Sequence, residues 1–194
     1  MKKFAALVFA LMMLFAMTAA QACGDTVVFG SYGYEPLTWQ VLSSDSQYTR
    51  LISEYVIACM PFDRHNSNWT TSDVRAWLND SFAYNAFSRA ERAQMCTLNN
   101  DLVRLPSLGD MTSYGYSRSR TAQDFSRAAM GNGYAVSGGL WVNRGNYCSY
   151  YTLTPNDSET LFQVRTNGSI GIARCDRDNV GIRAVIIVRT SALW

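Results

Sequence analysis

The sequence predicts an α+β fold on three observations. Runs of β-branched, leucine and aromatic residues separated by turn residues predict strands in the first third of the chain. Apolar residues at helical spacing follow. An Asn-Gly pair between two β-like runs predicts a hairpin near the C-terminus. The chain has no internal repeat, low-complexity tract or proline-rich linker, so we expect a single domain.

The first predicted strands lie within residues 25–58. The segment "DTVVFGSY" (25–32) is rich in β-branched and aromatic residues, and so is "LTWQVLSSDSQYTRLISEYVIA" (37–58). The turn-forming residues of "SSDSQ" (43–47) interrupt the second segment. We therefore expect one strand followed by two more that a turn connects.

Two helices are predicted next. Apolar residues recur at helical spacing in "TTSDVRAWLNDSF" (70–82), namely Val74, Trp77, Leu78 and Phe82. Ser72 or Thr71 can cap the start of this helix. Ser88 and Glu91 have the spacing of a capping box, so we expect a second, short helix to begin at Ser88.

The C-terminal part of the chain predicts an antiparallel sheet. In "TLFQVRTNGSIGIA" (160–173), a two-residue loop would pair Val164 with Gly171 and put the apolar residues of the two strands on opposite faces. A three-residue loop, with Gly168 as the left-handed bulge residue, gathers Phe162, Val164, Ile170 and Ile172 on one face, and we expect this register. The last apolar run, "IRAVIIVRT" (182–190), predicts a central strand.

Residues 1–22 have the pattern of a secretory signal peptide. Lys2 and Lys3 precede an uncharged run from Phe4 to Ala20, and the triplet at 20–22 has the small residues of a cleavage site. A membrane-spanning helix is the weaker alternative, because these 17 residues fall short of the roughly 20 that a span needs. We expect an exported protein whose mature domain covers residues 23–194.

Cys23 is the predicted lipid attachment site. Cleavage after Ala22 leaves this cysteine first, where its thiol can carry a diacylglyceryl group. Ala20 and Gln21 depart from the usual lipoprotein pattern, so a soluble secreted or periplasmic product is the alternative. The chain has five cysteines, and lipidation of one leaves an even number. For these four we expect two disulfides in an oxidising compartment, and loop length favours Cys59 with Cys96 and Cys148 with Cys175.

The charge balance excludes a nucleic-acid-binding surface of the usual kind. Loss of Lys2 and Lys3 with the signal reduces the 17 basic residues to 15, which equals the 15 Asp and Glu. Such a chain lacks the electrostatic footprint that a phosphate backbone or an anionic membrane surface requires. We expect no nucleic-acid partner, and membrane contact only through a lipid on Cys23.

Several segments resemble a known family. In chain order these are "FGSY", "LTWQVL", "LISEYVI", "ACMPF", "VRAWLNDSF", "AFSRAE", "YCSYYTLTP", "TNGS" and "VGIRAV". Over residues 26–188 the chain resembles the bacterial domain of unknown function 6273, which is similar to C-type-lectin-like and sulfatase-modifying-factor-like domains. The resemblance implies two helices packed on a twisted antiparallel sheet, and it carries no activity that maps onto named residues. Thr154 and Ala184 depart from the family's strand pattern.

Catalytic and metal-binding patterns are scarce. His65 is the only histidine, and the chain has no Cys-x-x-Cys or His-x-Glu spacing. Asp176, Asp178 and Asn179 could help to hold calcium, but they lack the spacing of an EF-hand and are typical of a polar turn. We therefore expect no catalytic residue, no metal and no cofactor.

The segment from Ser113 to Tyr151 has the composition of a recognition surface. Tyrosine, tryptophan and arginine alternate with glycine and serine there, as they do on binding loops. The candidate ligand-binding residues are Tyr114, Trp141, Arg144, Tyr147 and Tyr150. The alternative is that these aromatic side chains fill the core of a loop-rich fold.

These observations favour an exported, envelope-anchored module that binds an extracellular or envelope ligand, a glycan or a peptide, without turning it over. An enzyme related to sulfatase-modifying-factor-like domains is one alternative. A structural protein of the cell envelope is the other.

Overall fold

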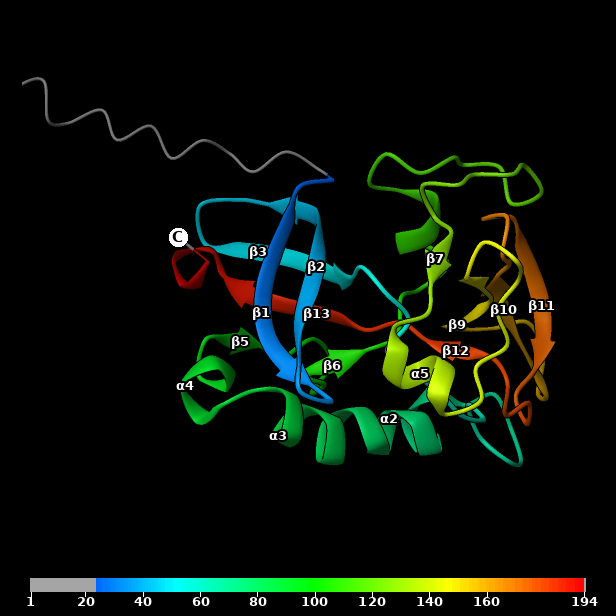
Figure 1. The fold of residues 1–194 in the computed structure, drawn as a ribbon, viewed down its shortest axis with the longest axis horizontal. Helices are drawn as coiled ribbons and strands as arrows, with labels where there is room; N and C mark the ends of the chain where they lie inside the picture. The colour runs from blue at the N-terminus through cyan, green and yellow to red at the C-terminus, as the bar shows by residue number, and fades with distance from the viewer. Residues whose placement is uncertain (1–23, 194) are drawn as a thin grey trace, which may run out of the picture.

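The computed structural model describes residues 24–193 and shows an α+β fold that is mostly sheet (Figure 1). Within these residues the chain forms a six-stranded, a five-stranded and a two-stranded sheet, with a few short helices. The predicted fold class is therefore confirmed at the level of α+β. The predicted signal peptide (1–22) and Cys23 lie outside the described residues.

The six-stranded sheet is antiparallel throughout. Its strand order is β1-β2-β3-β13-β5, and β6 also pairs with β13. The strands are β1 (Thr26–Tyr32), β2 (Glu35–Ser44), β3 (Tyr48–Ser53), β5 (Met95–Cys96), β6 (Val103–Arg104) and β13 (Val185–Arg189). The three N-terminal strands and the turn after Ser44 match the prediction. The central place of β13 also matches the prediction, because β3 pairs with one of its edges and β5 and β6 pair with the other.

A bent helical segment packs beside this sheet, at the bottom of Figure 1. It consists of η1 (Trp69–Thr71), α2 (Asp73–Trp77), η2 (Leu78–Phe82) and α3 (Ala83–Ala86). Ser72 caps α2, because its side chain accepts a hydrogen bond from the Arg75 backbone N–H. The middle part, η2, is a π-helical turn. The wider turn places Asn79 beside β6, where its amide bonds the backbone of Leu102 and Val103.

The second predicted helix is α4 (Arg89–Arg92), a single turn with the expected capping box. Ser88 Oγ accepts from the Glu91 N–H, and the Glu91 carboxylate accepts from the Ser88 N–H at 2.7 Å. The same carboxylate accepts from the Gly30 N–H at 3.1 Å. The capping box therefore also attaches α4 to β1.

The five-stranded sheet has the order β11-β10-β9-β12-β4, with one parallel pair, β9 and β12. Its strands are β4 (Ala58–Cys59), β9 (Tyr150–Pro155), β10 (Thr160–Val164), β11 (Ile170–Arg174) and β12 (Gly181–Ile182). Val164 pairs with Ile170, and Gly168 has a φ of 75°. The predicted three-residue loop and register are confirmed.

A third, two-stranded sheet consists of β7 (Ala129–Met130) and β8 (Tyr147–Cys148). The connection between these strands carries α5 (Gly133–Ser137), which lies between the two larger sheets in Figure 1. Two further 3₁₀ turns are η3 (Asp110–Thr112) and η4 (Thr190–Ala192).

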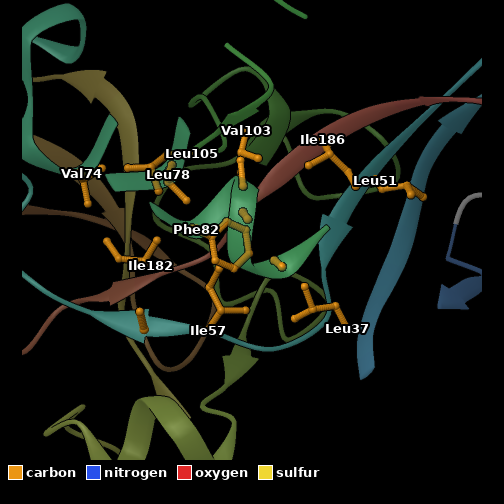
Figure 2. Packing of buried hydrophobic residues seen from close by; sticks show 14 of the residues in the cluster. Leu37, Leu51, Ile57, Val74, Leu78, Phe82, Val103, Leu105, Ile182 and Ile186 are labelled. Carbon is orange, nitrogen blue, oxygen red and sulfur yellow. The ribbon is translucent and has the colours of Figure 1, made fainter. Parts of the chain in front are cut away.

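The main core lies where the six-stranded sheet, the bent helical segment and β12 meet (Figure 2). Leu37 and Leu51 come from the sheet, Leu78 and Phe82 from the π-helical turn, and Ile182 from β12. A second apolar cluster lies between the two larger sheets and includes Ala135 of α5. Residues of α5 also line the pockets described next.

Candidate functional site

The first candidate pocket, which we call the Trp77 pocket, has a volume of about 480 Å³. Three aromatic side chains from separate elements line it: Tyr32 at the end of β1, Trp77 at the end of α2, and Tyr134 in α5. The remaining lining residues are Ala58, Cys59, Met60, Ala135, Ser137 and Gly138. The wall is therefore largely apolar and aromatic, which is usual for a small-ligand site.

The second, which we call the Glu35 pocket, has a volume of about 360 Å³ and a more mixed lining. Glu35, Thr38, Ser53 and Asn132 supply its polar side chains, and Tyr55 and Ile57 are among its apolar ones. Ser53 is held in place because its Oγ donates to Tyr55 O at 2.8 Å and accepts from the Ala184 N–H at 3.0 Å.

The two pockets are neighbours. Ile57 and Gly133 line the Glu35 pocket, while the next residues in the chain, Ala58 and Tyr134, line the Trp77 pocket. Across the β1–β2 turn, Tyr32 of one pocket pairs with Glu35 of the other. The start of α5 and the tip of the β1–β2 hairpin therefore separate an aromatic pocket from a polar one.

Local sequence explains the position of α5. Asn132 caps the helix through its side-chain oxygen, which accepts from the Ala135 N–H at 2.8 Å. The backbone on either side pairs with Val56, whose N–H donates to Met130 O while its carbonyl accepts from the Asn132 N–H. Gly131 is needed between them, because a Cβ there would lie 2.6 Å from a methyl of Leu140.

Tyr32 and Cys59 stay neutral near pH 7 in the Trp77 pocket. Burial, with the hydrogen-bonded Tyr134 hydroxyl as a second cause, raises the pKa of Tyr32 to about 12. Burial, followed by the negative charge of Asp178, raises the pKa of the Cys59 thiol. The Cys59 thiol points at backbone carbonyls, with Gly138 O at 3.4 Å. These groups are therefore a phenol and a thiol, not a phenolate and a thiolate.

The candidate residues predicted from sequence do not form one surface. Trp141 is 58% exposed and Arg144 is exposed, whereas Tyr114 and Tyr147 are half-buried. Tyr147 packs against the ring of Phe125, and Tyr114 lies 5.9 Å from the guanidinium of Arg50. Tyr150 is fully buried, so it has no surface with which to touch a ligand. None of these five residues lines either pocket.

Tyr150 has a structural role instead. Its hydroxyl donates to Arg127 O at 2.6 Å and accepts from Arg183, which is also fully buried. Arg183 donates further to Ser53 O at 2.7 Å and to the Gln40 side chain at 3.0 Å. This network connects the six-stranded sheet to β9 where the chain crosses between the two larger sheets.

The four described cysteines are free thiols, so neither predicted disulfide is formed in residues 24–193. Loop length favours sequential pairs, but the strand order separates their members. Cys59 lies in the five-stranded sheet and Cys96 in the six-stranded one. Cys148 belongs to the cluster between the sheets, and Cys175 to the main core.

Metal-ligating side chains do not gather in the described part of the chain: no three of its His, Cys, Asp and Glu residues are placed to hold an ion. Asp176 of the polar turn is bound to Arg174 at 3.0 Å. His65 is exposed and lies outside both pockets. Of the helices between residues 24 and 193, none is long and apolar enough to cross a membrane.

Sequence reasoning missed most of the residues that the pockets bring together. Tyr32 and Trp77 were assigned to a strand and to the apolar face of a helix, where they are indistinguishable from core residues by spacing alone. Tyr134 belongs to the aromatic segment, in "GNGYAVSGG" (131–139). The density of glycine around Tyr134 is the one local signal that a short exposed element begins there.

Comparison of the chain with protein-family models, with curated proteins and with solved structures finds no match.

Proposed function

We propose that this protein is a non-catalytic ligand-binding or adhesion module of the cell envelope, and that a glycan or a peptide occupies the Trp77 and Glu35 pockets. The observation that carries the proposal is the convergence of Tyr32, Trp77 and Tyr134, from three distant parts of the sequence, on one pocket. Aromatic side chains supply large contact areas at little cost in conformational entropy, which is why binding sites use them.

The chemistry of the lining favours binding over turnover. General acid–base catalysis needs a group whose pKa lies near the working pH, and the pKa values of Tyr32 and Cys59 are both shifted upward, away from it. Nucleophilic catalysis needs a base beside the nucleophile, and Cys59 donates to backbone carbonyls instead. A related oxidative enzyme would need thiolates, but burial raises the pKa of Cys148 to about 12.

The finer assignment of fold and family is part of the same proposal. We propose that the chain has a C-type-lectin-like arrangement and belongs with domain of unknown function 6273. Two points support this. The segment "VRAWLNDSF" (74–82) forms the helical turn that packs on the main core, and "VGIRAV" (180–185) forms the crossing between the two larger sheets.

The envelope location depends on Cys23 and the preceding signal. If Cys23 carries the lipid, labelled fatty acid is incorporated into the wild-type protein and not into Cys23→Ser. Equal incorporation into both proteins, or none into either, contradicts lipid anchoring and leaves a soluble exported protein.

The test of function combines ligand arrays with stability measurements. Tyr134 is half exposed but packs on Tyr32, so Tyr134→Ala should lower the melting temperature only modestly and weaken binding by about 2 kcal/mol or more, the usual loss at a hot spot. Trp141→Ala is the matched control, because Trp141 is an exposed aromatic residue outside both pockets. It should change neither quantity.

Two results would overturn the proposal. The first is the absence of any ligand on broad glycan and peptide arrays, which would favour a structural envelope protein. The second is a ligand whose affinity falls in Trp141→Ala and not in Tyr134→Ala, which would move the site to the surface first expected from the sequence.

A further inference from the structure

The aromatic walls of the Trp77 pocket meet at steep angles. The ring planes of Tyr32 and Trp77 are 83° apart with their centroids at 6.3 Å, and those of Tyr32 and Tyr134 are 75° apart at 5.0 Å. A sugar ring stacks best on one flat aromatic face. These rings contact each other edge to face, so a ligand does not fit between them and meets them from the open side of the pocket. The face of an aromatic ring that a ligand meets there attracts a cation, and alkylated ammonium ions are bound in this way.

The charge around the pocket also suits a cation. None of the described residues that line the two pockets is Arg, Lys or His, and the carboxylate among them is that of Glu35. Asp178 is near enough to Cys59 for its negative charge to contribute to the raised pKa of that thiol. A cation in the Trp77 pocket would therefore lie against aromatic side chains with carboxylates nearby, and no like charge among the lining residues would repel it.

Resting on the binding function proposed above, we propose that the glycan or peptide carries an alkylated ammonium group, for which choline serves as the probe, and presents it to Tyr32, Trp77 and Tyr134. A methylated ammonium is more weakly hydrated than a bare one, so it loses less hydration free energy when it leaves water. The raised pKa of Tyr32 keeps its ring a neutral phenol. Glu35, which pairs with Tyr32 across the β1–β2 turn, adds a carboxylate in the adjoining pocket.

The decisive comparison is choline against its neutral tert-butyl analogue, which has the same shape without the charge. By isothermal titration, choline should bind the purified protein and the analogue should bind at least about 10-fold more weakly. Tyr134→Leu keeps an apolar side chain and removes the ring, so it should weaken choline binding about 3- to 30-fold. Trp141→Leu should leave the choline affinity unchanged.

The labelling of two half-exposed cysteines can report where choline binds. Cys59 lines the Trp77 pocket, whereas Cys96 lies in β5 and lines neither of the two pockets. Choline should slow maleimide labelling of Cys59 and leave labelling of Cys96 unchanged. Equal protection of both cysteines, or of neither, would overturn the assignment of the cation to this pocket.

Vesicles distinguish the two sources of the group. Binding to phosphatidylcholine vesicles that is lost in Tyr134→Leu would identify a lipid headgroup and would overturn the assignment to a glycan or a peptide. Binding of free choline without binding to vesicles is the expected result for a soluble ligand that carries the group. Equal affinity for choline and its neutral analogue would overturn the inference. An array ligand that depends on Tyr134, together with no choline binding, would overturn the inference while leaving the proposed function intact.

Discussion

Replacing Arg127 with methionine should destabilise the protein strongly, although the side chain is remote from both pockets. Arg127 is fully buried. Its five N–H groups donate to five backbone carbonyls, those of Met111, Ser117, Ser119, Ala122 and Gly168. The guanidinium therefore holds the 111–122 loop against the turn between β10 and β11. Methionine has a similar length and removes every donor.

The expected loss of stability follows from the backbone carbonyls that are left without a donor. The carbonyls of Gly168 and Met111 are bonded in fully buried surroundings, at 2.8 and 3.0 Å. A buried acceptor left without a partner costs about 1–3 kcal/mol, so these two together cost about 2–6 kcal/mol. The other three carbonyls are partly exposed and can bond water instead. We expect a decrease of about 4 kcal/mol in the free energy of unfolding, a large part of the usual total.

Urea unfolding at neutral pH measures this loss. Arg118→Met is the matched control, because Arg118 is an exposed arginine within the same loop, and it should change the free energy of unfolding by less than about 0.5 kcal/mol. Amide hydrogen exchange should also become faster in residues 111–122 of Arg127→Met than elsewhere. A loss below about 1 kcal/mol, or unchanged exchange in this loop, would refute the assigned role of Arg127.

Three further predictions concern stability. Gly168→Ala should cost more than about 2 kcal/mol in urea unfolding, because an alanine strains the left-handed backbone and its Cβ would overlap the Asp124 carbonyl; a neutral effect would contradict the turn geometry. Burial alone would raise the pKa of Asp110, but Arg104 and the Ser107 hydrogen bonds outweigh burial and lower that pKa. The stability that ionised Asp110 gives to the fold is therefore complete above the unfolded-state pKa of about 3.9, and it is lost as pH falls through the folded-state pKa. Asp110→Asn should lower the free energy of unfolding by about 3 kcal/mol at pH 7 and reduce its decrease at acid pH. If the decrease at acid pH is unchanged in this variant, other carboxylates cause it. Ser88→Ala should cost about 1 kcal/mol by loss of the capping box, and no change would show that α4 is held by packing alone.

Local chemistry made much of the fold predictable. The capping residues Ser72 and Ser88 and the left-handed Gly168 each form bonds with residues a few positions away, so short stretches of sequence carry the signal. The continuous apolar run at 182–190 likewise indicated a central strand. The π-helical turn was not predicted, and the contact that it makes possible, between Asn79 and β6, joins distant segments of the chain.

The candidate site was less predictable for the same reason. The ring of Tyr134 meets that of Tyr32 about a hundred positions earlier in the chain, and spacing says nothing about such pairs. Tyr150 shows the opposite error. Its composition-based assignment to a binding surface was wrong because a buried tyrosine needs a partner for its hydroxyl, and Arg127 O and Arg183 supply one inside the protein.

The position of β13 at the centre of the six-stranded sheet has a consequence for how the chain folds. The hydrogen bond from Arg183 to Ser53 joins residues 130 positions apart, and β13 then closes on β3. Contacts of such long range make folding slow. Until residues 181–189 are in place, β3 and β9 both have open edges, which is where unfinished sheets aggregate. A chain that ends at Val180 would therefore lack both β12 and β13, and both larger sheets would be left incomplete.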